Sequence, residues 1–170
     1  MPPQSPGTPS STPTSISFSM SLRCSVMRSR MSLNALFQHP ELYRSAVAVS
    51  PVTHWRLYDN VYTERFNGLI TENKAGYDHG SPLSYVDGMR GNLLLVHGGG
   101  DDNVHYQNSE MLINALVAAG KPFEMMEYPN RTHCICQGKN TTLHLFSLMT
   151  RYLDEHLMGP TPGPSKQAAN

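Results

Sequence analysis

Several features that would point at once to a class of function are missing from this chain of 170 residues. It carries no excess charge, because 13 Lys and Arg residues balance 13 Asp and Glu residues. It therefore lacks the strongly basic composition of proteins that attract nucleic acids, and we expect no nucleic-acid partner. No apolar run approaches the roughly 20 residues that a spanning helix needs, so we expect no membrane segment.

Cysteine is also scarce, and the three residues are Cys24, Cys134 and Cys136. Three thiols do not make the paired framework of a small secreted domain. A single residue separates Cys134 from Cys136, and this short spacing disfavours a bridge between them. We therefore expect reduced thiols, which slightly favours a cytosol-like compartment.

Carboxylates are absent from the start of the chain, where the first one is Glu41. Residues 1–30 are rich in Ser, Thr and Pro, a composition typical of disorder or of a disturbed reading frame. A Ser-rich, Arg-containing and acid-poor segment also fits an organelle transit peptide. Residues 159–170 form a second polar stretch. We predict disordered tails at 1–30 and 159–170 around one folded domain at 31–158.

The folded part alternates between strand and helix patterns. Short apolar runs bounded by Pro or Gly predict strands at 45–50, 92–97 and 123–128, and longer periodic segments predict helices ending at 38 and covering 109–119 and 142–157. Strands that alternate with helices of these lengths indicate an α/β fold with a parallel sheet and crossover helices. Three strands make a poor domain alone, so we interpret them as part of a larger sheet.

The stretch with most chemistry is L-L-L-V-H-G-G-G-D-D-N-V-H at residues 93–105. An apolar strand stops at a glycine turn and presents Asp101 and Asp102. His133 follows the next predicted strand, so both turns open on one edge of the sheet. An acid that is followed along the chain by a histidine matches the last two members of the Ser…Asp…His order in which α/β-hydrolases carry their catalytic triad. We favour Asp101 as the acid and Asp102 as a turn or capping group. The alternative is a solvated turn and a surface histidine.

Histidines and cysteines near these turns invite a metal interpretation. His97 and His105 flank the acids, and Cys134 and Cys136 follow His133. Neither set provides two ligand pairs at zinc-like spacing, so we expect no metal.

Three motifs resemble the prolyl oligopeptidase family of serine peptidases, most closely its dipeptidyl peptidase IV branch. Residues 97–105 resemble the pattern H-G-x-x-D-D-N-V-H, and residues 50–65 resemble S-P-V-x-x-W…Y-D-x-x-Y-T-E-R. Residues 128–133 resemble Y-P-x-x-x-H. The resemblance runs from about Met31 to Leu157. It implies the C-terminal half of an α/β-hydrolase fold.

The resemblance also implies a function and a set of site residues. Asp101 would be the triad acid and His133 the triad base, and Asn103 would help to hold a backbone carbonyl of the substrate. A pocket for proline or alanine beside the scissile bond would be lined by Val52, Trp55, Tyr58, Tyr62 and Val104. The branch removes N-terminal dipeptides from peptide substrates and needs no cofactor. It also implies a homodimer through the surface near the last helix.

One family motif is not found. The nucleophile elbow G-W-S-Y-G-G should precede Met31, but those positions read C-S-V-M-R-S-R at residues 24–30. When the family motif is aligned with this sequence, the position of the nucleophilic serine falls on Val26. The neighbouring Ser25 is not flanked by the glycines that an elbow needs. Since triad members act as a unit, we expect no peptidase activity from this polypeptide alone. We interpret it as a fragment of a serine peptidase.

Two other interpretations stay open. The first is a non-catalytic relic that binds peptides or dimerises. The second is an esterase or acylaminoacyl hydrolase of the same fold, although the pair Tyr58 and Tyr62 argues against it. Those two tyrosines, four residues apart, would share one face of a helix.

Overall fold

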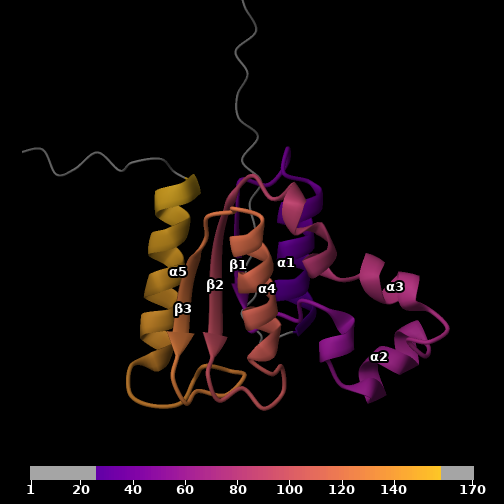
Figure 1. Cartoon of the computed structure of the whole chain (residues 1–170). Helices are drawn as coiled ribbons and strands as arrows, with labels where there is room; N and C mark the ends of the chain where they lie inside the picture. The colour runs from indigo at the N-terminus through magenta and orange to yellow at the C-terminus, as the bar shows by residue number, and fades with distance from the viewer. Residues whose placement is uncertain (1–25, 158–170) are drawn as a thin grey trace, which may run out of the picture.

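The computed structural model describes residues 26–157 and shows a parallel sheet covered by helices on both faces (Figure 1). The strands β1 (Ser45–Val49), β2 (Asn92–Gly98) and β3 (Glu124–Tyr128) lie in the order β1-β2-β3. The main helices are α1 (Val26–Gln38), α4 (Gln107–Ala118) and α5 (Thr141–Leu157). The predicted α/β fold with crossover helices is confirmed. Among the described residues, no helix is long and apolar enough to cross a membrane.

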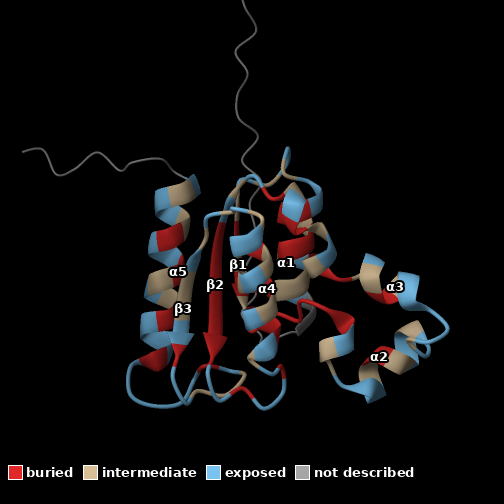
Figure 2. Ribbon diagram, viewed as in Figure 1, coloured by how far each residue is buried: buried red, intermediate tan, exposed pale blue. Residues whose placement is uncertain are grey.

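The central strand β2 is buried on both faces because each face has its own helical cover. Leu93 and Leu95 pack with side chains of α1 and α4 in one core cluster. Leu94 and Val96 point the other way and pack with side chains of α5. Figure 2 shows β2 as a continuous buried strand between these layers. A strand covered on both faces reads as an unbroken apolar run, which is why its position was predictable.

Helix α1 begins earlier than the sequence pattern indicates. Its first five residues, 26–30, fall inside the stretch for which we predicted disorder. The Ser29 hydroxyl donates to the Val49 carbonyl over 2.6 Å and accepts from the Val49 N–H at 3.1 Å, which ties this turn of the helix to the end of β1. The rest of the predicted tails, including any transit peptide, lies outside the described residues.

The long connection between β1 and β2 contains four short helices. They are η1 (Trp55–Leu57), α2 (Asn60–Asn67), α3 (Lys74–His79) and η2 (Pro82–Gly88). Asp59 caps α2 by accepting a hydrogen bond from the Tyr62 N–H at 2.9 Å. Tyr58 therefore precedes the cap, and the prediction that Tyr58 and Tyr62 share one helical face is wrong. The two rings instead meet edge-on from neighbouring elements, 5.7 Å apart.

The two ends of α4 differ in how they are capped. Gly120 adopts φ +63° just after the helix, the left-handed conformation typical of a glycine that ends a helix. At the other end, the cap position is Tyr106 and no side chain caps the helix. Asp102 is exposed in the preceding turn, so the turn interpretation fits it and the capping interpretation does not.

The expectation of free thiols at Cys134 and Cys136 is wrong, because the structure joins them in a disulfide. The residue between them, Ile135, has a positive φ of 46°. This backbone conformation curls the chain so that the two Cα atoms lie 5.2 Å apart, well within the range of bridged cysteines. Spacing alone argued against the bridge because an extended chain would hold the Cα atoms of residues i and i+2 about 6.6 Å apart, near the upper limit for bridged cysteines.

Candidate active site

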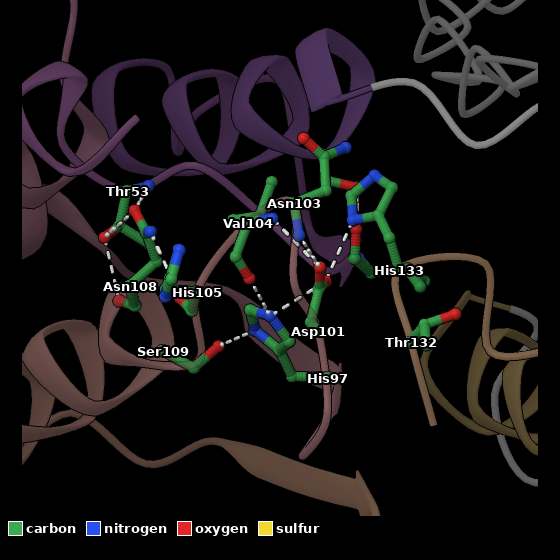
Figure 3. Close-up of polar contacts among 12 residues, drawn as sticks. Thr53, His97, Asp101, Asn103, Val104, His105, Asn108, Ser109, Thr132 and His133 are labelled. Atoms are coloured by element: carbon green, nitrogen blue, oxygen red, sulfur yellow. Dashed lines mark hydrogen bonds and ion pairs between the residues drawn. The ribbon is translucent and has the colours of Figure 1, made fainter. Parts of the chain in front are cut away.

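The two residues predicted as acid and base lie side by side at one edge of the sheet (Figure 3). Asp101 stands in the turn after β2, and His133 stands in the loop after β3. Both turns follow the carboxyl ends of paired parallel strands, which is why they converge. The distance from His133 Nδ1 to Asp101 Oδ2 is 2.9 Å. The Asp101 side chain is 0% exposed, whereas 15% of the His133 side chain remains accessible.

The Asp101 carboxylate is held by its own turn as well as by His133. Oδ1 accepts hydrogen bonds from the backbone N–H groups of Asn103 at 3.0 Å and Val104 at 2.9 Å. Burial alone would raise the pKa of Asp101, but hydrogen bonds from His133, His97 and these two N–H groups outweigh it and hold the pKa well below its usual range. The carboxylate therefore stays ionised despite its burial.

His97 completes this network, although its place in the sequence suggested only a metal ligand. The imidazole is fully buried at the end of β2. Its Nε2 lies 2.9 Å from the Val104 carbonyl oxygen and 3.2 Å from Asp101 Oδ2. Both are acceptors, so Nε2 carries a proton. In the neutral form, Nδ1 accepts from the Ser109 hydroxyl at 2.6 Å. Figure 3 shows the imidazoles of His97 and His133 on either side of the carboxylate.

The role of His97 depends on tertiary contacts, and the sequence contains only one weak signal of it. Because His97 lies at the end of a buried strand, four residues before an acid, its side chain has little access to solvent. Its partner Ser109 belongs to α4 and is itself buried, which no local pattern reveals. Within residues 26–157, no group of three or more His, Cys, Asp or Glu side chains is arranged to hold a metal ion.

The glycine turn allows the acid loop and the histidine loop to touch. A Cβ atom at Gly98 would lie 2.3 Å from the Arg131 carbonyl oxygen, a distance that side chains do not tolerate. The Gly100 N–H donates to that same carbonyl at 3.0 Å. The turn after β2 thus packs directly on the backbone that leads into His133.

The geometry fixes the tautomer of His133. Because Asp101 is ionised, it accepts the proton on His133 Nδ1, and the neutral ring carries its lone pair on Nε2. An imidazole held in this way can take a proton from a hydroxyl or thiol at Nε2 and return it to a leaving group. The buried carboxylate stabilises the imidazolium formed between those two events.

The residues predicted to line a substrate pocket also gather in one place. Val52, Trp55 and Val104 are buried in a single cluster, and Tyr58 and Tyr62 pack against it. The rings of Trp55 and Tyr62 stack with centroids 5.8 Å apart. The cluster adjoins the acid turn because Val104 belongs to both.

Asn103, the sixth predicted binding residue, faces the same cluster. Its side-chain oxygen accepts a hydrogen bond from the Tyr58 hydroxyl at 3.3 Å. Burial, with a smaller contribution from Asp59, raises the pKa of Tyr58, so the hydroxyl stays protonated and can donate. The long connection between β1 and β2 is also anchored to α4 through Thr53. Its N–H and its hydroxyl donate hydrogen bonds to Asn108 at 3.0 and 2.8 Å.

A surface hollow of about 350 Å³ borders this aromatic cluster. Trp55, Tyr62 and Phe66 line it together with Arg30, whose guanidinium lies 4.4 Å from the Trp55 ring centroid. Asp101 and His133 are not among its lining residues.

Comparison with known proteins gives a consistent result. The sequence model that describes the prolyl oligopeptidase family matches residues 30–159 of this chain. Mouse dipeptidyl peptidase 8 is 39% identical over 133 residues, which cover 75% of this chain and 14% of that protein. Venom dipeptidyl peptidase 4 of Apis mellifera is 40% identical over 114 residues, or 65% of this chain and 14% of that protein.

A solved structure agrees with these relatives. The crystal structure of Porphyromonas gingivalis dipeptidyl peptidase 4 superposes with a TM-score of 0.74 at 40% identity. The match covers 76% of this chain and 18% of that one. The chain thus spans only a small part of the length of the proteins that it resembles.

Proposed function

Because the chain belongs to the prolyl oligopeptidase family of serine peptidases, we propose that it supplies the acid and the base of a catalytic triad in a dipeptidyl-peptidase-like enzyme. The observation that carries the proposal is the 2.9 Å contact between His133 Nδ1 and the buried, ionised Asp101 carboxylate. A surface histidine beside a solvated turn would not have a fully buried acid as its partner.

In this proposal each residue has a defined task. His133 Nε2 takes the proton of a serine hydroxyl as that oxygen attacks the peptide carbonyl, and it then protonates the leaving amine. Asp101 keeps the proton on Nδ1 and stabilises the imidazolium. An acyl-enzyme forms, and water releases the dipeptide by the same steps.

The start of α1 lies where a nucleophile would be needed. The Ser29 bonds place the first turns of α1 at the carboxyl end of β1, on the same sheet edge as Asp101 and His133. The family register puts the nucleophile on Val26, which has no hydroxyl. We therefore expect the purified chain of 170 residues to release no chromophore from a Gly-Pro substrate.

Substrate selection would come from the aromatic cluster. Tyr58, Tyr62, Val52, Trp55 and Val104 would enclose a proline or alanine side chain, and Asn103 would hold a backbone carbonyl. An apolar wall with one amide at its edge suits a small apolar residue in a peptide. This supports cleavage of N-terminal dipeptides after proline or alanine.

A chimera tests the proposal. Residues 31–158 would replace the aligned segment of mouse dipeptidyl peptidase 8, so that the host provides its own elbow. We expect hydrolysis of a Gly-Pro chromogenic substrate, and loss of that hydrolysis on His133→Ala. A soluble chimera that does not cleave the substrate, or one whose turnover survives His133→Ala, would overturn the proposal.

Homodimerisation through the surface near α5 is part of the same proposal. Leu143 and Leu157 of α5 are 67% and 52% exposed, which supports an apolar contact there. Light scattering of the purified chain measures it directly: we expect a dimer, and a monomer for the variant Leu143→Glu/Leu157→Glu. A wild-type chain that stays monomeric would refute the dimer.

A further inference from the structure

The disulfide between Cys134 and Cys136 lies directly beside the proposed triad base. Cys134 follows His133 in the chain, and both cysteines are exposed. Disulfides react when a thiolate can approach one sulfur along the bond, so an exposed bridge is open to exchange. Small rings closed over a single residue are rarely used as structural staples, because the loop they close is short.

The residue enclosed by the ring is unusual in two ways. Ile135 is β-branched yet adopts φ +46°, a conformation that such residues rarely hold without support. Its side chain is fully buried in the cluster that includes Leu94, Val96 and Met149. Its N–H donates to the Thr132 carbonyl at 3.0 Å, across His133. The ring, the buried anchor and this hydrogen bond together enclose the backbone of His133.

We propose that Cys134 and Cys136 form a reversible thiol–disulfide site, and that its redox state determines how firmly His133 is held against Asp101. In the oxidised form the bridge keeps Ile135 in its left-handed conformation. After reduction, Ile135 can return to the ordinary region of backbone space, and the chain on either side of His133 loosens. The consequence for catalysis rests on the proposed function, whereas the redox site itself does not.

The exchange balances with two molecules of a monothiol such as glutathione as reductant. The thiolate of the first molecule attacks a protein sulfur, forms a mixed disulfide and releases the other cysteine as a thiolate. The thiolate of the second molecule then attacks the glutathione sulfur of that mixed disulfide, releases the first cysteine and forms oxidised glutathione. Two electrons pass to the protein, and both cysteine thiolates take up protons. One molecule of oxidised glutathione reverses the reaction.

Thiol counting tests the site. The variant Cys24→Ser, which retains only these two cysteines, is equilibrated with glutathione at several ratios of its reduced and oxidised forms. Acid quenching, alkylation and intact mass measurement then give the number of free thiols. We expect zero or two, interconverting reversibly, with the bridge favoured about tenfold or more in the native chain over the chain in guanidinium. Equal equilibria in the two states, or free thiols at every ratio, would overturn the proposal.

The coupling to His133 needs a separate measurement. In ¹⁵N-histidine-labelled protein, the Nδ1–H of His133, assigned with His133→Gln, reports its hydrogen bond to Asp101. We expect a downfield, slowly exchanging signal in the oxidised chain that is lost on reduction. The variant Cys134→Ser/Cys136→Ser should lack it with or without reductant. Circular dichroism should stay the same in all these states.

The outcomes separate the two proposals. An identical His133 signal in both redox states would refute the coupling, and loss of the helical spectrum on reduction would refute a local effect. Neither measurement uses peptide hydrolysis, so a failed chimera assay leaves both results standing.

Discussion

His97 Nε2 lies 3.2 Å from Asp101 Oδ2, the same oxygen that His133 approaches from the other side. A buried carboxylate needs partners for each of its lone pairs, and this one has two backbone N–H groups and two imidazoles. The arrangement explains how Asp101 stays ionised although its side chain is fully buried. It also makes His97 a positioning residue, which acts on the proposed base through the acid.

Replacing His97 should destabilise the fold. The variant His97→Leu leaves the Val104 carbonyl and the Ser109 hydroxyl without their buried partner, which typically costs about 1–3 kcal/mol per unsatisfied group. We expect the free energy of unfolding in urea to fall by about that amount. Ser109→Ala, which removes only the hydroxyl, is the matched control and should cost about 1 kcal/mol. Equal stability of His97→Leu and wild type would contradict this network.

The contact between the loop that carries Asp101 and the loop that carries His133 depends on Gly98. Gly98→Ala would place a methyl group 2.3 Å from the Arg131 carbonyl oxygen and push the loop that carries His133 away. We expect thermal unfolding at a lower temperature and a weakened His133 Nδ1–H signal. Gly100→Ala is the control, since its nearest neighbour would be 3.4 Å away and its effect should be small. Equal behaviour of the two variants would show that the loops can separate without loss.

The positions of the strands were predictable because they depend on local composition. An apolar run bounded by Pro51, the Gly98 turn or Pro129 has one available interpretation, and parallel pairing places all three ends together. The order of Asp101 and His133 along the chain then brings them close. This is why the contact between Asp101 and His133 could be predicted before any distance was known.

Other features could not be predicted because they depend on tertiary contacts. The partnership of His97 with Ser109 joins a strand to a separate helix. The disulfide closes around Ile135, which combines a positive φ with burial against α5, and neither feature can be read from its neighbours in sequence. Tyr58 was assigned to a helical face because the capping role of Asp59 was not recognised.

Acid should reveal the contribution of Asp101 to stability. Its pKa is lowered in the folded state, so the unfolded chain binds the proton more readily. The stabilisation is fully present above the unfolded pKa of about 3.9 and is lost as the pH falls toward the folded pKa. We expect the urea midpoint of wild type to fall more steeply below about pH 4 than that of Asp101→Asn. Asp102→Asn, at an exposed site, should follow wild type, and parallel curves for all three would contradict the assignment.

The central claim is that Asp101, and not its neighbour Asp102, is the acid partner of His133. The most direct measurement compares kcat for a Gly-Pro substrate in the chimera with Asp101→Asn and with Asp102→Asn. We predict a loss of about 10⁴-fold for Asp101→Asn, because the amide selects the wrong tautomer of the imidazole. Asp102→Asn should retain activity within about tenfold. Retained activity in Asp101→Asn together with its loss in Asp102→Asn would contradict the account.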